Sequence, residues 1–295
     1  MSIGLSAFCL QCHLRRSLDT ARSLGSEQTA TAFARELMKL YLAAPEDASA
    51  PWFSADTARL FHEFYGLDLD RFREEKRLSN EFVLSALPEI QRRVEQADDP
   101  VYAALQYAVL GNYIDYSALE GEVSMETFGK MLSEGELLSL DRENYRALCR
   151  DLSAGGKLLY LTDNAGEIGF DRVLAQQIHR RYPQVDITFC VRGGPALNDA
   201  TREDAAAVGI PFPVIDSGAP ISGTVPERLG QEAREAFSSA DVILAKGQGN
   251  AETLLGCGKN VYYAFLIKCV WFRHLFGKEK FTPMLLRDCQ WLSAK

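Results

Sequence analysis

The first half of the chain has the hydrophobic spacing of amphipathic helices. In one stretch, hydrophobic residues recur every three or four positions, at Ala30, Phe33, Ala34, Leu37, Met38 and Tyr41. This spacing places them along one face of a helix. Further helical stretches contain Leu60, Phe61 and Phe64 or span Glu81–Gln96 and Val101–Leu110. One of these ends near Gly66, and we expect Pro88 to kink or split another. Residues 1–150 are therefore predicted to form a helical N-terminal domain.

After about Gly155 the pattern changes to short hydrophobic runs that alternate with helical stretches. Strands are predicted over Lys157–Thr162, Asp186–Val191, Pro213–Ile215, Asp241–Ala245 and Val261–Ile267. The predicted helices between them are Glu167–Tyr182, Asp199–Val208 and Pro226–Ser239. Such alternation is typical of α/β proteins, in which helices cover a parallel sheet. We therefore predict an α/β domain over residues 151–295, with ligands bound beyond the carboxyl ends of its strands.

The segment after the first predicted strand combines oxygen ligands with a helix start. Asp163 and Asn164 follow the strand directly, and a small-residue turn then leads to Glu167. A carboxylate and an amide side by side suit a hard divalent cation, and a helix N-terminus suits an anion. The alternative is an Asx turn with a helix cap, which Asp and Asn also favour.

A second acidic residue follows the next predicted strand. Asn198 and Asp199 come after a glycine-containing turn and begin a helix, where either residue could act only as an N-cap. However, the carboxyl ends of parallel strands share one edge of the sheet. Together with Asp163 and Asn164, Asp199 would therefore form a site with three oxygen ligands. This coincidence favours a metal site over two unrelated turns.

Two later loops contain candidate substrate contacts. Lys246 ends the fourth predicted strand and precedes Gly247, Gln248 and Gly249. A lysine beside flexible backbone amides can meet a phosphoryl group, although a solvated lysine in a glycine-rich turn is the alternative. The order of a Walker P-loop is absent. Ser217 follows the third strand and is a weaker candidate for hydrogen bonds to a substrate.

Charge and composition narrow the possible functions. The 295 residues have a formal net charge of −8, which argues against a general nucleic-acid binder because phosphates require a basic face. Hydrophobic residues make up 47%, as in an ordinary globular protein. No apolar run reaches the roughly 18 residues that span a membrane. The seven scattered cysteines do not form a disulfide framework, so a reducing cytoplasm is the expected location.

Two features lie in the helical half. Cys9 and Cys12 form a C-x-x-C-H pattern with His13, formally that of c-type haem attachment, but no export signal or second cysteine pair accompanies it. An incidental or structural thiol pair is therefore the default interpretation. Asn112 and Asp115 follow an apolar helix and could face the cleft or simply end the helix.

In this order, the motifs resemble those of the metal-dependent damage-control phosphatases, once catalogued as a domain of unknown function. The resemblance rests on C-x-x-C at Cys9 and Cys12, Gly111-Asn112 with Ile114-Asp115, Asp163-Asn164-Ala165-Gly166-Glu167, Asn198-Asp199-Ala200-Thr201 and Lys246-Gly247-Gln248-Gly249-Asn250. It extends from Cys9 to about Cys269. The cysteine pair is similar to that of the prokaryotic branch of the family.

The resemblance implies a helical N-terminal domain on a Rossmann-like α/β/α domain with a mainly parallel sheet. It assigns the metal ligands to Asp163, Asn164 and Asp199 and the phosphate-contacting lysine to Lys246. The implied activity is hydrolysis of phosphate esters, including sugar phosphates and damaged metabolites, with Mn²⁺, Co²⁺, Ni²⁺ or Mg²⁺. Arg192, before the second acidic motif, would either add a phosphate contact or be solvated.

We therefore predict a metal-dependent phosphatase that acts on small phosphorylated metabolites. Asp163 would also serve as base or nucleophile, and Lys246 with the amides at Gly166 and Glu167 would neutralise charge that develops on the phosphoryl group. Substrate contacts are predicted at Asn112, Asp115, Glu167, Asn198, Ser217, Lys246 and Gly247. The alternatives are a nucleotide- or cofactor-binding protein without hydrolysis, and a thiol redox or metal protein centred on Cys9 and Cys12.

Overall fold

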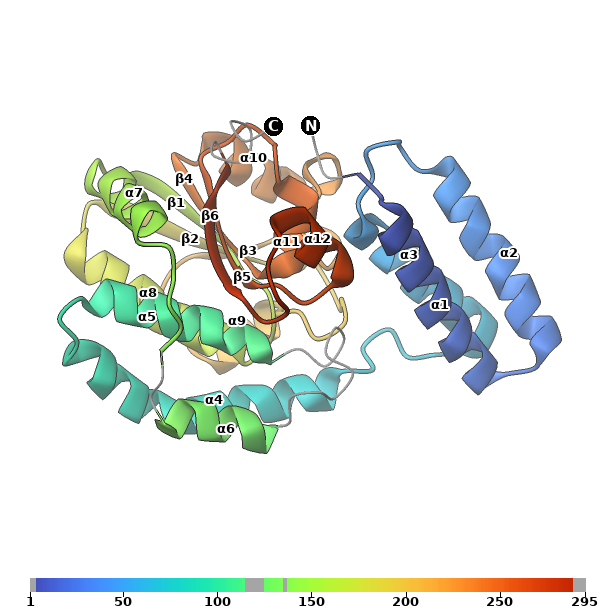
Figure 1. The fold of residues 1–295 in the computed structure, drawn as a ribbon, viewed down its shortest axis with the longest axis horizontal. Helices are drawn as coiled ribbons and strands as arrows, with labels where there is room; N and C mark the ends of the chain where they lie inside the picture. The colour runs from blue at the N-terminus through green and yellow to red at the C-terminus, as the bar shows by residue number, and fades with distance from the viewer. Residues whose placement is uncertain (1–3, 115–124, 135–136, 289–295) are drawn as a thin grey trace.

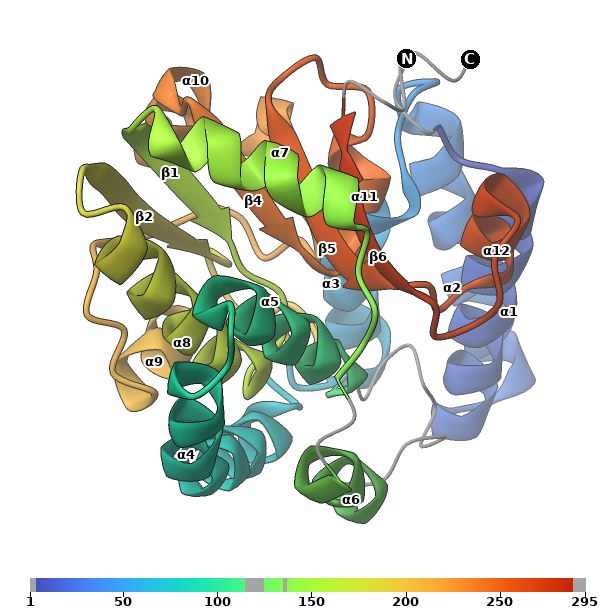
Figure 2. The same cartoon turned by 60° about the vertical axis from the view of Figure 1, so that its left-hand side comes forward.

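The computed structural model describes residues 4–114, 125–134 and 137–288 (Figures 1 and 2). Its α-helices before the first strand are α1 (Ala7–Leu24), α2 (Glu27–Ala43), α3 (Ser54–Tyr65), α4 (Arg73–Glu95), α5 (Pro100–Leu110), α6 (Met125–Glu134) and α7 (Arg142–Ser153). The later ones are α8 (Glu167–Arg181), α9 (Arg202–Ala207), α10 (Gln231–Ser239), α11 (Gly247–Leu254) and α12 (Val270–Phe276). Local chemistry fixes several of these ends. Ser26 caps α2 by accepting a hydrogen bond from Thr29 N, and Gly66, with φ of 64°, ends α3 in the left-handed conformation.

The strands form one mixed sheet, in the order β3-β2-β1-β4-β5-β6. They are β1 (Gly156–Leu161), β2 (Val185–Val191), β3 (Val214–Asp216), β4 (Val242–Lys246), β5 (Val261–Leu266) and β6 (Pro283–Arg287). The pairs from β3 to β5 are parallel, and β6 lies antiparallel to β5. The predicted α/β fold with a mainly parallel sheet is thus confirmed. The first five strands begin and end within one residue of their predicted bounds, whereas β6 was not predicted.

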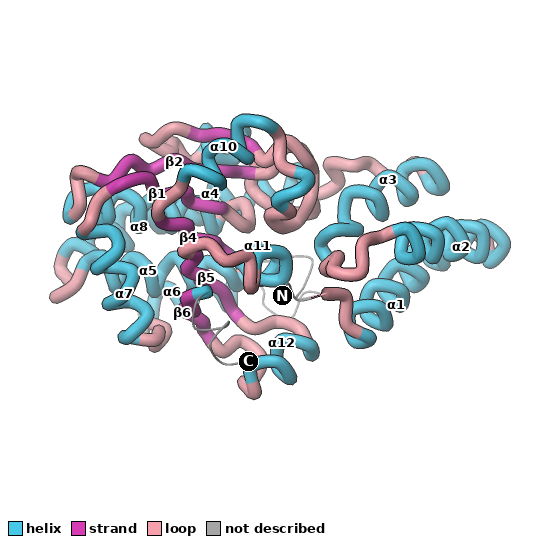
Figure 3. The backbone as a smooth tube through the Cα atoms, turned by 90° about the horizontal axis from the view of Figure 1, so that it is seen from above, coloured by secondary structure: helices cyan, strands magenta, loops and turns pink. Residues whose placement is uncertain are grey.

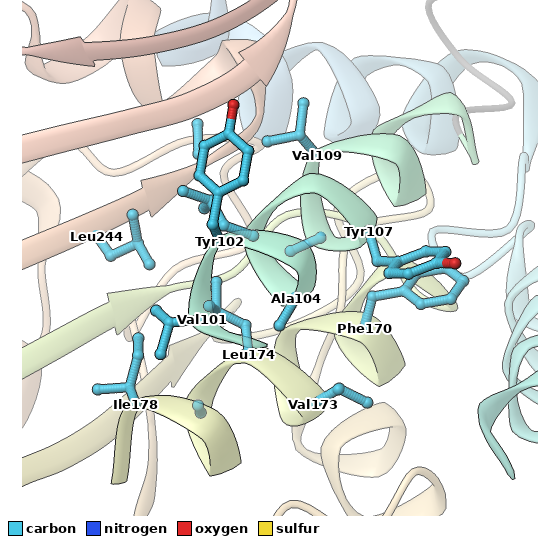
Figure 4. Close-up of a cluster of buried hydrophobic side chains, with 14 of the residues drawn as sticks. Val101, Tyr102, Ala104, Tyr107, Val109, Phe170, Val173, Leu174, Ile178 and Leu244 are labelled. Carbon is cyan, nitrogen blue, oxygen red and sulfur yellow. The ribbon is translucent and has the colours of Figure 1, made fainter. Parts of the chain in front are cut away.

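Alternate residues of each strand enter different cores. Tyr160 of β1 lies in a core formed with α4, α5, α7 and α8 on one face of the sheet. Leu159 lies in a second core with α10, α11 and α12 on the other face. Figure 3 shows these two groups of helices on opposite sides of the strands. Figure 4 shows how tightly α5 and α8 pack within the first core, where Tyr107 lies beside Phe170.

The helices before the sheet divide into two groups. Helices α1, α2 and α3 enclose a small core of their own, centred on Phe33 and Phe61, and lie to one side of the sheet in Figure 1. Phe8 of α1 stacks on Trp271 and connects this group to α12. Helices α4, α5 and α7 instead share the core beneath the sheet. The domain division at residue 150 stays a prediction, since residues on both sides of it contribute to that core.

Several local predictions were wrong. Pro88 does not split its helix, although a kink there stays a prediction: α4 continues to Glu95, with Val83, Leu87, Ile90 and Val94 buried along it. The helix predicted over Pro226–Ser239 is a 3₁₀ turn followed by α10. The glycine-rich segment after Lys246 begins α11 rather than an open turn. In the part of the chain that the structure describes, no helix is long and apolar enough to cross a bilayer.

The sheet topology determines where a ligand can bind. From β1 the chain moves outward through β2 to β3, and then returns to the other side of β1 to form β4 and β5. The connections toward β2 and those toward β5 therefore run in opposite directions, and they separate between the carboxyl ends of β1 and β4. Open α/β sheets bind ligands at such a switch point. Asp163 follows β1, and Lys246 ends β4.

Candidate active site

The loops after β1 and β2 pair with each other and bring the predicted ligands together. Ala200 N donates to Asp163 O over 2.7 Å, and Ala165 N donates to Asn198 O over 2.9 Å. Asn164 and Asp199 form an isolated antiparallel bridge between the two loops. Asp163, Asn164 and Asp199 are all buried. The structure thus places the three predicted metal ligands side by side at the switch point.

The Asp163 carboxylate is held by two amides and a glycine. Its Oδ2 accepts hydrogen bonds from Asn112 Nδ2 and Asn164 Nδ2, both at 2.8 Å. Gly247 faces the same carboxylate with φ of 79°, and a Cβ atom built on it would lie 2.0 Å from Asp163 Oδ2. Only glycine fits this position, because its conformation and its closeness to the carboxylate both exclude a side chain.

The environment of Asp163 disfavours an isolated negative charge. Burial raises the pKa of Asp163 well above its usual range, and the nearby carboxylates of Glu167 and Asp199 raise it further. The cations Lys268 and Arg192 act in the opposite direction. A buried, crowded carboxylate of this kind would gain greatly from a bound cation, because its charge would then be compensated at short range.

Lys246 is fully buried, and all its donors are used within the protein. Its Nζ donates to Glu167 Oε1 and Asp171 Oδ1 at 2.7 Å and to Ala108 O at 2.8 Å. An ammonium group has three donors, so these bonds account for each of them. Burial works against the charged form, yet the two carboxylates hold the pKa of Lys246 above its ordinary value. The predicted phosphate contact of Lys246 stays a prediction, and its visible role is to hold Glu167.

Glu167 and Asn112 connect this ion pair to Asp163. Glu167 Oε2 accepts from Asn164 Nδ2 at 2.9 Å and from Asn112 Nδ2 at 3.0 Å. Asn112 Oδ1 in turn accepts from Leu266 N at 3.1 Å, at the end of β5. Asn112 therefore lies in the site, as predicted, but its amide is occupied by neighbouring protein groups. Glu167 and Asn112 therefore position the carboxylate of Asp163 and the amide of Asn164.

The other predicted contacts lie farther from Asp163 in the hydrogen-bond network. Asn198 Nδ2 donates to Ile114 O at 3.2 Å, while its buried Oδ1 has no hydrogen-bond partner among the described residues. The Ser217 hydroxyl accepts from Gly193 N and donates to Ala219 O within its own loops. Substrate contacts by Asn198 and Ser217 stay predictions. Asp115 lies outside the described residues.

The backbone amide of Gly166 is not available for the role predicted for it. It donates to Asn80 Oδ1 over 2.7 Å, and Asn80 Nδ2 donates to Asp204 Oδ1 over 2.9 Å. Asn80 comes from α4, so a helix of the N-terminal half fixes the start of α8. The expectation that the Gly166 amide would face a phosphoryl group was therefore wrong.

Sequence reasoning missed some of the site's charged residues. Asp171 lies one turn after Glu167 on α8, and this i, i+4 spacing could have indicated a shared face. Burial raises the pKa of Asp171 to about 6, although Lys246 opposes the rise. Arg192 was expected either to contact phosphate or to be solvated; the structure shows it buried, with Nε donating to Asp199 Oδ2 at 2.6 Å. Lys268 follows β5 at the same sheet edge, where a lysine after an apolar run was a usable signal.

Cys9 and Cys12 lie on α1, a helix that contacts α12. The cysteines of the described residues are free thiols: Cys9, Cys12, Cys149, Cys190, Cys257 and Cys269. Ser6 Oγ donates to Cys9 Sγ at 3.1 Å, and burial raises the pKa of the Cys9 thiol. Over residues 4–114, 125–134 and 137–288, no three His, Cys, Asp or Glu residues form a group able to hold a metal ion. The predicted site differs from such a group, because its third ligand is the amide of Asn164.

The fold and the site define an α/β protein with a carboxylate-rich centre at its switch point. A family model described as the damage-control phosphatase ARMT1-like domain matches residues 5–282. The chain belongs to this family. Its resemblance to the damage-control phosphatases is therefore confirmed, and with it the predicted phosphatase function at the level of the family. Assignment to the branch with the cysteine pair stays a prediction.

Similar proteins include two archaeal relatives. A damage-control phosphatase from Archaeoglobus fulgidus is 35% identical over 215 residues, which cover 72% of this chain and 73% of that protein. Damage-control phosphatase PH1575 from Pyrococcus horikoshii is 33% identical over 212 residues, 70% of this chain and 71% of the relative. The crystal structure of PH1575, described as a DUF89 family protein, superimposes with a TM-score of 0.78 and 26% identity, covering 96% of this chain and 99% of that one.

Proposed function

We propose that this protein is a metal-dependent phosphatase that hydrolyses phosphate monoesters of small metabolites, including damaged or sugar phosphates. The observation that supports this most is the juxtaposition of Asp163, Asn164 and Asp199 in a chain of the damage-control phosphatase family. The proposal includes a small phosphorylated molecule as partner and the cytoplasm as location.

The chemistry of these residues fits a hard divalent cation. Two carboxylates and one amide provide oxygen ligands of the kind that Mg²⁺ and Mn²⁺ prefer. Asn164 directs its Nδ2 to Asp163 and Glu167, so its Oδ1 is the amide atom left for a cation. Gly247 leaves the Asp163 carboxylate room that any side chain would fill. We propose Mn²⁺, Co²⁺, Ni²⁺ or Mg²⁺ as the bound ion.

When bound, such an ion would polarise the phosphoryl oxygens and lower the pKa of a water molecule. The protein's own contribution is orientation. Asn112 and Asn164 fix the carboxylate of Asp163. Glu167 accepts hydrogen bonds from both amides, and Lys246 holds Glu167 in place through a buried ion pair. We propose that Asp163 also acts as the base or the nucleophile.

The test is hydrolysis of an aryl phosphate by the purified chain, with and without each of the four cations. We expect turnover that disappears in the presence of a chelator and returns when a cation is added. Asp163→Asn should remove turnover, whereas the exposed, opposite-edge control Lys157→Met should not. Turnover that survives both chelation and Asp163→Asn would refute the proposal. Binding of phosphorylated ligands without turnover would favour the non-hydrolytic alternative.

A further inference from the structure

A cavity of about 530 Å³ lies among α7, the start of α5 and the end of α8. Its lining includes Asp99, Arg142, Tyr145, Arg146, Arg150 and Arg181. Helix α5 ends two residues before Asn112 and helix α8 begins at Glu167, so both helices extend from the candidate active site to this cavity. At about 1.5 Å per residue, these helices are roughly 15–22 Å long. The cavity is therefore separate from the centre around Asp163, and its volume is typical of small-ligand sites.

The lining of the cavity is basic, although the whole chain is acidic. Four arginines and one aspartate give the lining a formal charge of +3, compared with −8 for the chain. The aspartate is already used within the protein. Asp99 accepts hydrogen bonds from Tyr145 Oη at 2.7 and 2.8 Å and from Arg181 Nη1 at 3.2 Å. The other three arginines, all on α7, therefore have no opposite charge in the cavity.

These three arginines are spaced so that their charges repel one another. Arg142, Arg146 and Arg150 are four residues apart on α7, which places them in one row along the helix. Like charges at this spacing destabilise a helix. Within the described ranges 4–114, 125–134 and 137–288, none of the three forms an ion pair. Other helices of this chain pair such arginines with a carboxylate one turn away, as Arg92 is paired with Glu89. The row on α7 therefore has an electrostatic cost that a bound anion would remove.

Two guanidinium groups at this cavity are held by aromatic side chains. Arg142 lies over the ring of Tyr102, with its Cζ 3.4 Å from the ring centroid. Arg181 Nη1 contacts the Tyr145 hydroxyl at 3.5 Å in addition to its bond to Asp99. Because these contacts restrict the side chains before a ligand arrives, less conformational entropy is lost on binding.

We infer that this cavity binds a small anion with several negative charges, of the oligophosphate class. Arginine suits phosphoryl oxygens, because its planar donors match their spacing and its charge does not depend on pH. The row from Arg142 to Arg150 extends over about 12 Å of helix. A chain of phosphoryl groups can lie along the whole row, whereas a single phosphate contacts only part of it. The ligand is either an inorganic oligophosphate or the phosphate chain of a nucleotide.

The test is calorimetric titration of inorganic tripolyphosphate into the full chain, freed of divalent cations by dialysis so that the metal centre plays no part. The double variant Arg146→Gln, Arg150→Gln removes two charges and keeps good helix formers. Arg35→Gln, at an exposed arginine of α2, is the control. We expect the double variant to weaken binding about tenfold or more, as for loss of charged hydrogen bonds, and the control to change it less than about twofold. Without ligand, the double variant should unfold at the same or a slightly higher urea concentration than wild type, because the repulsion is reduced.

Two further titrations define the ligand. Inorganic monophosphate should bind wild type at least about tenfold more weakly than tripolyphosphate, because it meets fewer of the arginines. A nucleoside triphosphate that binds more tightly than tripolyphosphate, and loses affinity in the double variant, would identify the ligand as a nucleotide; equal affinity would identify the phosphate chain alone. No binding of tripolyphosphate at millimolar concentration, or wild-type affinity in a folded double variant, would overturn the inference.

Discussion

Replacing Lys246 with methionine tests how much its fully buried ammonium group contributes to stability and to the site. The substitution keeps the length of the side chain and removes the ammonium group. Glu167 and Asp171, both fully buried, would then lose their shared cation, and Ala108 O would lose its donor. Removing one partner of a buried ion pair costs about 3–5 kcal/mol, because the remaining charge is left without compensation. We expect the free energy of unfolding to fall by about that amount at pH 8.

The cost should depend on pH, because Asp171 can take up a proton. Its pKa in the folded protein is about 6, above its ordinary value, so the stability that Asp171 contributes is greatest at low pH and is lost as the pH rises through 6. Without Lys246, which lowers this pKa, the loss shifts to a higher pH. At pH 5 the carboxyl group is mainly neutral in the variant as well. The destabilisation should therefore be clearly smaller at pH 5 than at pH 8.

The assay is urea unfolding of wild type, Lys246→Met and the control Lys157→Met at both pH values. A destabilisation below about 1 kcal/mol at pH 8, which is typical of exposed ion pairs, would refute the reasoning. Measuring metal affinity and turnover per bound metal ion distinguishes two roles for Lys246: positioning Glu167, or contacting the phosphate directly. A positioning role predicts weaker metal binding, because Glu167 no longer holds Asn164. Unchanged metal affinity with a turnover loss of about 10²-fold or more would instead support direct contact with phosphate.

Three further predictions concern the same centre and the thiols. Asp199→Ala should abolish metal-dependent turnover and weaken metal binding, and full activity in this variant would contradict its assignment as a ligand. Gly247→Ala should lower kcat strongly, with a loss of stability of about 1–2 kcal/mol by urea unfolding, because its Cβ would displace the Asp163 carboxylate and the backbone is left-handed there. The double variant Cys9→Ser, Cys12→Ser should keep kcat within about tenfold of wild type, a change of roughly 1.4 kcal/mol in the barrier; a larger loss in a folded protein would show that the thiols take part.

The strands at the centre of the sheet were predictable because they are buried on both faces. The segments that became β1, β4 and β5 are short, apolar runs bounded by polar residues, which is typical of parallel strands covered by helices. Strand β6 lacks this signal. It begins at Pro283 and ends at Arg287, and most of its residues are only partly buried. As an antiparallel strand at the edge of the sheet, it depends on pairing with β5 more than on its own sequence pattern.

The candidate site shows a similar division. Asp163, Asn164 and Asp199 were predictable because strand ends on one edge of a sheet converge. The environment of Lys246 was not predictable, because its acceptors Ala108 and Glu167 lie 138 and 79 residues away in the sequence. No local pattern distinguishes a lysine that faces a ligand from one that ends in a buried ion pair. The same holds for Arg192, whose partners are Gly223, 31 residues away, and Asn250 on α11, 58 residues away.

The position of Asn112 has a consequence for synthesis of the chain. Asn112 donates to Asp163, 51 residues later, and accepts from Leu266 N, 154 residues later. The side chain that orients the central carboxylate is therefore fixed only after β5 has joined the sheet. We therefore expect the centre to be incompletely ordered in a nascent chain that still lacks β5, or in a fragment that ends between α5 and β1. The phosphatase site is then among the last parts of the protein to form, and it requires the whole length of the chain from α4 to β5.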